Sequence, residues 1–282
     1  MTVKIRSAIG ICILATQFIT GRATMGAERF YDAGFKADLE FLGPERKERL
    51  DLYYPKSPAP GEKFPGVVVI HGGGWCGGDK GARREINIGS NLARAGYVCV
   101  SINYELFKPK KPSWPQNIYD CKRAVQYLRV NAERLHVDPE RIGSIGGSAG
   151  GHLAAMIGVC GPDAELEPPA PYPGVSSKVH AAVYMYGLAN LLDWVCRGKQ
   201  VFADQKAMLG ASHKENRKLW ESASPIFQAD ANDCPILLLH GTKDTTNYYT
   251  QSERFAKRLA EIGLEHECYI IEGAGHQSSV FL

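Results

Sequence analysis

Runs of hydrophobic residues recur along the chain from residue 66 onward. They are apolar at almost every position, which is typical of parallel strands covered on both faces. Upstream, two stretches alternate apolar with polar residues, as half-exposed antiparallel strands do. This pattern predicts strands at residues 35–42, 48–54, 66–70, 97–104, 141–145, 180–187, 235–241 and 267–273.

Stretches with helical periodicity lie between these runs. In residues 118–132, apolar side chains from Ile118 to Leu128 recur at spacings of three and four and so share one face. Residues 149–159 and 251–263 are also predicted to be helical. The alternation predicts an α/β fold, with a mostly parallel sheet of eight strands and helices on both faces. Functional residues of such sheets lie at the carboxyl ends of the strands.

Two stretches depart from this alternation. Residues 161–178 are rich in proline, and residues 188–224 are mixed and contain Trp194 and Trp220. We interpret both as insertions over the carboxyl edge of the sheet, forming a small lid or a substrate wall. The rest of residues 28–282 has the length expected of a single catalytic domain.

The first 27 residues have a pattern of their own. Lys4 and Arg6 precede a short apolar run, and small residues follow around Gly21 and Gly26. These features predict a signal peptide at residues 1–27 and a secreted or periplasmic mature protein. An uncleaved membrane anchor is the alternative, but the run is shorter than the roughly 20 residues of a spanning helix.

Charge and cysteine content limit the partners. The net charge of +3 includes Lys4, Arg6 and Arg22 and therefore falls to zero without residues 1–27. No basic excess remains to attract nucleic acid or an anionic membrane. None of the eight cysteines forms a C-x-x-C pair, so no metal site is predicted. An oxidising compartment permits one or two disulfides, and spacing favours no pairing.

The sequence G-x-S-x-G at residues 146–150 is the first candidate for chemistry, with Ser148 at its centre. It joins a predicted strand to a predicted helix. A sharp turn there exposes the serine at the top of the sheet, and flanking glycines let neighbouring backbone pass without a Cβ clash. The helix N-terminus and the N–H of Ala149 favour developing negative charge. Ser148 is therefore the predicted nucleophile.

A serine hydroxyl needs a base, and the base needs an orienting carboxylate. His276 follows the last predicted strand, and Asp244 follows the strand at 235–241. The order serine, aspartate, histidine is the one that such sheets use. Among the other histidines, His71 and His240 precede glycine turns and fit the role of base less well.

The segment "HGGGW" at residues 71–75 is the candidate for the donors that stabilise a negatively charged substrate oxygen. Glycines after a buried strand let backbone N–H groups point at a substrate oxygen. We predict an oxyanion hole formed by Gly73, Gly74 and Ala149. Trp75 is predicted to bind substrate beside it, with a core position as the alternative.

At these residues the chain resembles α/β-hydrolase-fold esterases. The segments "HGGGW", "GGSAGGHLA", "HGTKD" and "GAGH" are similar to those of the acetyl esterase/lipase group in the hormone-sensitive-lipase-like branch. The similarity covers residues 35–276 and is closest to bacterial feruloyl and acetylxylan esterases. It implies a triad of Ser148, His276 and Asp244, no cofactor, and activity on short acyl esters.

The expected function is therefore that of a secreted serine carboxylesterase. Its substrate would be a small ester or an acylated oligosaccharide, with short-chain acyl or feruloyl groups on plant polysaccharide fragments. One alternative is an amidase or peptidase of the same fold, such as a kynurenine-formamidase-like enzyme. Another is a non-catalytic, ligand-binding member of the fold. The sequence indicates no oligomeric state.

Overall fold

The computed structural model of the chain describes residues 2–3, 30–161, 166–196, 199–200 and 202–281. Nearly all of the predicted signal peptide lies outside these residues, so its presence stays a prediction. No helix within the described residues is long and apolar enough to cross a membrane.

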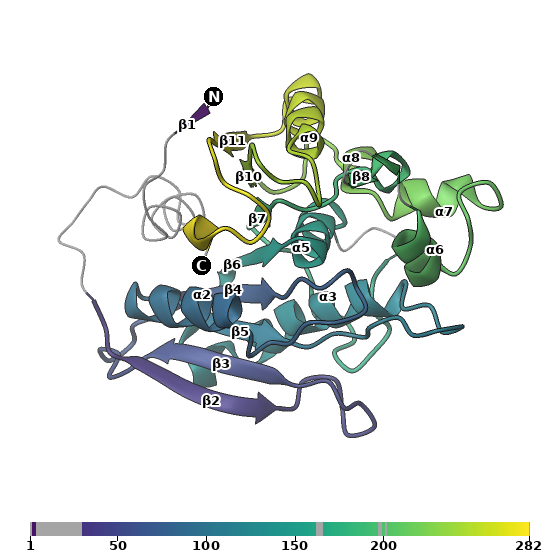
Figure 1. Cartoon of the computed structure of the whole chain (residues 1–282). Helices are drawn as coiled ribbons and strands as arrows, with labels where there is room; N and C mark the ends of the chain where they lie inside the picture. The colour runs from purple at the N-terminus through teal and green to yellow at the C-terminus, as the bar shows by residue number, and fades with distance from the viewer. Residues whose placement is uncertain (1, 4–29, 162–165, 197–198, 201, 282) are drawn as a thin grey trace.

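A sheet of eight strands forms the centre of the molecule, in the order β11-β10-β7-β6-β4-β5-β3-β2 (Figure 1). A two-residue strand, β1 (Thr2–Val3), pairs with the outer edge of β11. β3 runs antiparallel to both of its neighbours, β2 and β5, and the other neighbouring strands pair in parallel. The eight predicted strands are thus confirmed. Their bounds are β2 (Ala33–Leu39), β3 (Leu50–Pro55), β4 (Phe64–Ile70), β5 (Val98–Ile102), β6 (Val137–Gly147), β7 (Ala181–Met185), β10 (Ile236–Gly241) and β11 (His266–Ile271).

Helices cover both faces of this sheet. The three predicted helices are present as α3 (Gln116–Val130), α5 (Ala149–Val159) and α9 (Thr250–Glu261). A fourth long helix, α2 (Arg83–Arg94), was not predicted. Shorter elements complete the described chain: α4 (Ala132–Leu135), α6 (Ala203–Leu209), α7 (Arg217–Ser222), α8 (Pro225–Gln228), the 3-10 turns η1 (Leu191–Asp193) and η2 (Ser279–Phe281), and the hairpin of β8 (Val195–Cys196) and β9 (Lys199–Gln200).

Strand β4 shows why the central runs are apolar throughout. Val68 and Ile70 point into the core beneath α3, α5 and α9, whereas Val67 and Val69 point into a second core beneath α2. All four side chains are fully buried. Because successive side chains of a strand point to opposite faces, a strand covered on both faces needs an apolar residue at every position.

The two predicted insertions lie in different places. The described part of residues 161–178 runs along α3, where the carbonyls of Ala170, Val175 and Ser176 accept hydrogen bonds from three side chains of that helix. This stretch therefore does not form a lid, and that prediction is corrected. Residues 188–224 supply α6 and α7, which lie beyond the carboxyl ends of the strands in Figure 1.

An ion pair with a buried carboxylate joins the segment before β3 to α3. The guanidinium of Arg46 donates to both carboxylate oxygens of Asp120, at 3.0 and 2.7 Å, and the Asp120 side chain is fully buried. Asp120 also accepts from the backbone N–H of Glu105, just after β5. One carboxylate thus fixes three segments that are distant in the sequence.

We expect Arg46→Leu to lower the free energy of unfolding by about 3 kcal/mol, because it leaves a buried carboxylate without its main cation. Arg217→Leu is the matched control, since it breaks an exposed pair with Glu221 and should cost at most about 0.5 kcal/mol. Urea unfolding of both variants measures the difference. Equal losses would contradict the structural role given to Arg46.

Candidate active site

Ser148 occupies a sharp turn between β6 and α5. Its backbone has φ 59° and ψ −124°, a strained conformation for a residue with a side chain. Its N–H donates to the carbonyl of Met185, at the end of β7, at 3.0 Å. A Cβ at Gly150 would lie 2.1 Å from the oxygen of Ile70, so only glycine fits there. The predicted turn is present, and its tight packing holds the serine at the carboxyl edge of the sheet.

The structure brings Asp244 and His276 to this serine. His276 Nε2 lies 3.1 Å from Ser148 Oγ, and His276 Nδ1 lies 2.7 Å from Asp244 Oδ2. A carboxylate can only accept, so Nδ1 carries the hydrogen and Nε2 is free to accept from the serine hydroxyl. The three side chains follow β6, β10 and β11, and together they form a continuous hydrogen-bonded chain.

Asp244 is held as an anion. Its residue is 3% exposed, and its Oδ1 accepts from the backbone N–H groups of Thr246 and Asn247, both at 2.9 Å. Burial alone would raise the pKa of this carboxyl, but hydrogen bonds from His240 and His276 lower it to about 2. At neutral pH a fixed negative charge therefore faces the imidazole of His276.

His240 is a positioning residue that sequence analysis did not recognise. Its Nε2 lies 2.8 Å from the carbonyl of Asn247 and 3.3 Å from Asp244 Oδ2, and its Nδ1 lies 2.7 Å from Ser252 Oγ. Because a carbonyl only accepts, Nε2 is the donor, and it is shared between Asn247 and Asp244. The signal in the sequence was a histidine near the end of a predicted strand, four residues before Asp244.

The glycine loop after β4 lies directly against Ser148. A Cβ at Gly72 would be 3.3 Å from the Cβ of Ser148, and Gly73 and Gly74 have φ values of 112° and 60°. Among the described residues, no recorded hydrogen bond uses the N–H groups of Gly73, Gly74 or Ala149. The predicted oxyanion donors are therefore available beside the serine, and their role stays a prediction.

His71 holds the start of this loop by a hydrogen bond. Its Nδ1 lies 2.6 Å from the carbonyl of Gly72, and its ring stacks on Tyr104 with centroids 4.4 Å apart. The hydroxyl of Tyr104 donates to the carbonyl of His71 at 3.0 Å. Burial lowers the pKa of His71 to about 4, so the imidazole is neutral at pH 7 and donates from Nδ1. The ring thus fixes the backbone that leads into the loop.

Trp75 lies in the core. It is 1% exposed, and its Nε1 donates to Nδ1 of His152 at 3.2 Å. The other ring nitrogen of His152 donates to the carbonyl of Ala223 at 2.7 Å. The ring joins the glycine loop to α5 and to residues 188–224, as in the core position named above as the alternative, and its contact with substrate stays a prediction.

Residues 188–224 border the site at two further points. The Trp194 indole donates to the carbonyl of Thr246, in the loop that carries Asp244, at 2.9 Å. A Cβ at Gly74 would lie 3.9 Å from Oδ2 of Asp204, in α6. This insertion therefore forms a wall beside the glycine loop.

A buried cluster that sequence analysis missed supports His276. The ring of Tyr186 meets the His276 imidazole at 4.9 Å and the ring of Phe281 at 4.6 Å. The hydroxyl of Tyr186 accepts from Arg84 at 2.6 Å, and Arg84 also pairs with Glu85. Arg84 lies in the unpredicted helix α2, far from Tyr186 in the sequence, so no local pattern marks the contact.

The described residues contain no group of three histidine, cysteine or acidic side chains able to hold a metal. Six cysteines with described side chains are free thiols: Cys76, Cys99, Cys121, Cys160, Cys234 and Cys268. Cys12 and the side chain of Cys196 lie outside the description.

Comparison with known proteins supports the fold. A model of the BD-FAE family matches residues 50–259. Esterase LipQ of Mycobacterium tuberculosis (strain ATCC 25618 / H37Rv) is 30% identical over 239 residues, which are 84% of this chain and 55% of LipQ. The chain thus spans little more than half the length of such curated relatives.

Two solved structures resemble this fold. A truncated form of a carbohydrate esterase from gut microbiota has a TM-score of 0.77 and 25% identity, covering 91% of this chain and 93% of that one. An acetyl ester-xyloside bifunctional hydrolase from Caldicellulosiruptor lactoaceticus has a TM-score of 0.68 and 25% identity, covering 84% and 82%.

Fold and relatives place the chain in one class, the proteins of the α/β-hydrolase fold, in which similar proteins are named esterases. Within that class, the chain belongs to the BD-FAE family. The resemblance to α/β-hydrolase-fold esterases in "HGGGW", "GGSAGGHLA", "HGTKD" and "GAGH" is confirmed.

The buried His152 generates a prediction about acid stability. Burial lowers its pKa to about 4, below the ordinary 6.5. Between these values the unfolded chain binds a proton that the folded chain does not, so the free energy of unfolding falls as pH drops from 6.5 to 4. For this group alone, the loss is roughly 2–3 kcal/mol at pH 4.5.

We expect His152→Gln to reduce this loss, because the amide keeps a donor and an acceptor but does not titrate. Urea unfolding of both proteins at pH 7 and pH 4.5 measures it. The same pH dependence in variant and parent would contradict the assignment of a buried, neutral His152.

Proposed function

We propose that the protein is a serine carboxylesterase in which Ser148 is the nucleophile, His276 the base and Asp244 the residue that orients it. The observation that carries this proposal is the unbroken chain of contacts, 3.1 Å from Ser148 to His276 and 2.7 Å from His276 to Asp244. A hydroxyl, an imidazole and a buried anion in this order generate a nucleophile at neutral pH.

The first step transfers the acyl group to the enzyme. His276 Nε2 takes the proton of Ser148 as Oγ attacks the ester carbonyl and forms a tetrahedral intermediate. The Asp244 carboxylate stabilises the imidazolium that results. Nε2 then gives its proton to the ester oxygen of the alcohol group. The bond between that oxygen and the acyl carbon breaks, and the alcohol leaves.

The second step repeats this sequence with water. His276 takes a proton from a water molecule that attacks the acyl-enzyme, and the acid leaves as Ser148 is regenerated. In both steps the negative oxygen would rest on the N–H groups of Gly73, Gly74 and Ala149. Removing one such donor costs about 10²–10³ in rate in other hydrolases.

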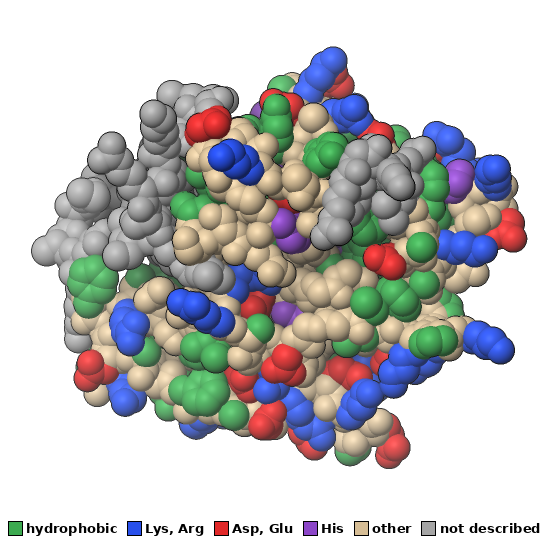
Figure 2. All heavy atoms as spheres, viewed as in Figure 1, with side chains coloured by type: hydrophobic (Ala, Val, Ile, Leu, Met, Phe, Trp, Pro, Cys, Tyr) green, Lys and Arg blue, Asp and Glu red, His purple; other side chains and the backbone are tan. Residues whose placement is uncertain are grey.

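The proposed substrates are short-chain acyl or feruloyl esters on plant polysaccharide fragments. Supporting this, one structural relative is named a carbohydrate esterase and another an acetyl ester-xyloside hydrolase. Secretion or export to the periplasm, expected from residues 1–27, would bring the enzyme to such polymers. Acidic and basic side chains are interspersed over most of the face in Figure 2, and a mixed surface of this kind suits a neutral ester better than a polyanion.

We expect Asp244→Asn to lower kcat about 10⁴-fold with little change in KM, because the amide cannot hold the same imidazole tautomer. Asp230→Asn is the matched control, since Asp230 is exposed and precedes β10 at its opposite end. Initial rates on p-nitrophenyl acetate measure both. A loss for Asp244→Asn no greater than for Asp230→Asn would contradict the proposed role.

The specificity for the acyl group is tested by comparing hydrolysis rates of p-nitrophenyl acetate and methyl ferulate, with Ser148→Ala as the blank. We expect both esters to be hydrolysed and both activities to vanish in the blank, since one nucleophile serves both. Activity on acetate alone would restrict the substrates to short acyl groups. A folded protein inactive on both esters would overturn the esterase proposal.

A further inference from the structure

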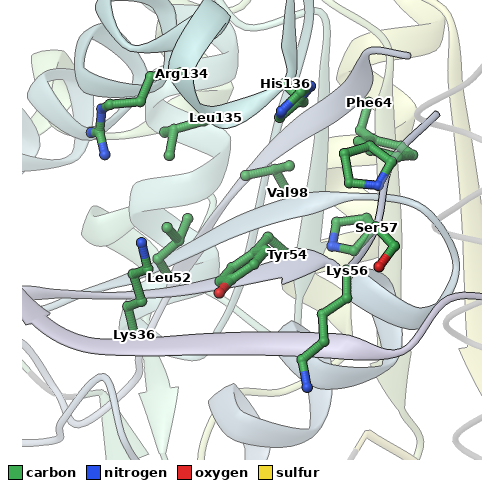
Figure 3. A pocket seen from close by; sticks show the side chains of 12 residues that line it. Lys36, Leu52, Tyr54, Lys56, Ser57, Phe64, Val98, Arg134, Leu135 and His136 are labelled. Atoms are coloured by element: carbon green, nitrogen blue, oxygen red, sulfur yellow. The ribbon is translucent and has the colours of Figure 1, made fainter. Parts of the chain in front are cut away.

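A second pocket lies at the opposite end of the sheet from Ser148. It is lined by the end of β3, the starts of β4 and β5 and the end of α4, and it has a volume of about 560 Å³ (Figure 3). Ligand pockets in proteins have volumes of about 300–1,000 Å³. The length of β4, roughly 20 Å at about 3.3 Å per residue, separates this pocket from the glycine loop of the active site.

The floor of this pocket contains apolar side chains and one flat ring. Leu52, Phe64, Val98 and Leu135 line it together with Tyr54. A Cβ at Gly34 would lie 2.4 Å from two ring carbons of Tyr54, so strand β2 lies against the Tyr54 ring. Tyr54 is only partly buried and is part of the pocket lining. The floor is therefore suited to a flat, apolar group.

The rim of the pocket is cationic. The cations Lys36, Lys56 and Arg134 line it together with His136, and no acidic side chain does. In Figure 3 the ends of Lys36 and Arg134 and the hydroxyl of Tyr54 lie on the same side of the pocket, whereas Lys56 extends away from it. The Nζ of Lys36 is 5.9 Å from the centre of the Tyr54 ring. Positive charge thus gathers at one side of the apolar floor.

These cations have no carboxylate partner among the described residues. Arg134 bonds through Nε and Nη2 to Asn131 and through Nη2 to Tyr127, both neutral, and no partner is recorded for its Nη1. Neither Lys36 nor Lys56 takes part in an ion pair within that part of the chain. An anion is the partner that this rim lacks.

We propose that this pocket is a second binding site, distinct from the active site, for a small aromatic carboxylate. The carboxylate would bind Lys36 and Arg134 and accept from the Tyr54 hydroxyl, while the ring and its unsaturated chain would lie over Tyr54, Leu52 and Val98. A neutral sugar has no charge for the rim, and an inorganic anion has no apolar surface for the floor. The site does not depend on the proposed catalytic function.

The test is calorimetric titration of the full chain carrying Ser148→Ala, with ferulate as the probe. We expect ferulate to bind. Coniferyl alcohol lacks the carboxylate and glucuronate lacks the aromatic ring, so each should bind at least about tenfold more weakly. Equal binding of ferulate and glucuronate would mean a non-specific charge effect and would overturn the proposal. So would the absence of ferulate binding.

Variants locate the bound ferulate. Replacing both Lys36 and Arg134 by alanine should weaken ferulate binding about fivefold to tenfold, because two exposed cations are lost. Lys214→Ala with Lys257→Ala removes the same charge from other elements and should leave binding unchanged. Unchanged affinity in the Lys36 and Arg134 variant would place ferulate elsewhere, the active site included, and overturn the proposal. Neither pair should alter esterase rates when Ser148 is present, so failure of this site and failure of the proposed function are distinguishable.

Discussion

The strained turn at Ser148 is the constraint on which the rest of the site depends. A side-chain-bearing residue at φ 59° persists only where its surroundings fix it. Here β6 leads into the turn, α5 leads out of it, and the carbonyl of Met185 holds the Ser148 N–H. The carbonyl of Ile70, at the end of β4, fills the space that a Cβ at Gly150 would need. The close packing of these neighbouring strand ends therefore holds the hydroxyl where His276 meets it.

Neutral, buried imidazoles hold the surrounding loops. His71 fixes the backbone before the glycine loop, His152 joins that loop to α5 and to Ala223, and both have a pKa lowered by burial to about 4. An imidazole that stays neutral offers one donor and one acceptor at fixed angles, which suits it to join backbone to side chain. The site thus rests on hydrogen-bonding residues that take no part in the proposed proton transfers.

Sequence alone predicted the eight strands, three of the helices and the three side chains that the structure brings together, because each depends on a local pattern. Apolar runs marked the strands, and the positions just after β6, β10 and β11 marked Ser148, Asp244 and His276. Helix α2 was missed although its buried positions recur at helical spacing, because two of them are the charged residues Arg84 and Glu85. The contacts of Arg84 with Tyr186 and of Trp75 with His152 join residues distant in sequence, so only the fold reveals them.

The most direct test of this account is the covalent labelling of the unsubstituted protein with paraoxon, followed by mass spectrometry of its peptides. An activated serine displaces the p-nitrophenolate and keeps the diethylphosphoryl group. The account predicts one such group per chain, on the peptide that contains Ser148, appearing in step with the loss of esterase activity and absent from Ser148→Ala. Labelling at another residue, or activity that persists after Ser148 is fully labelled, would contradict it.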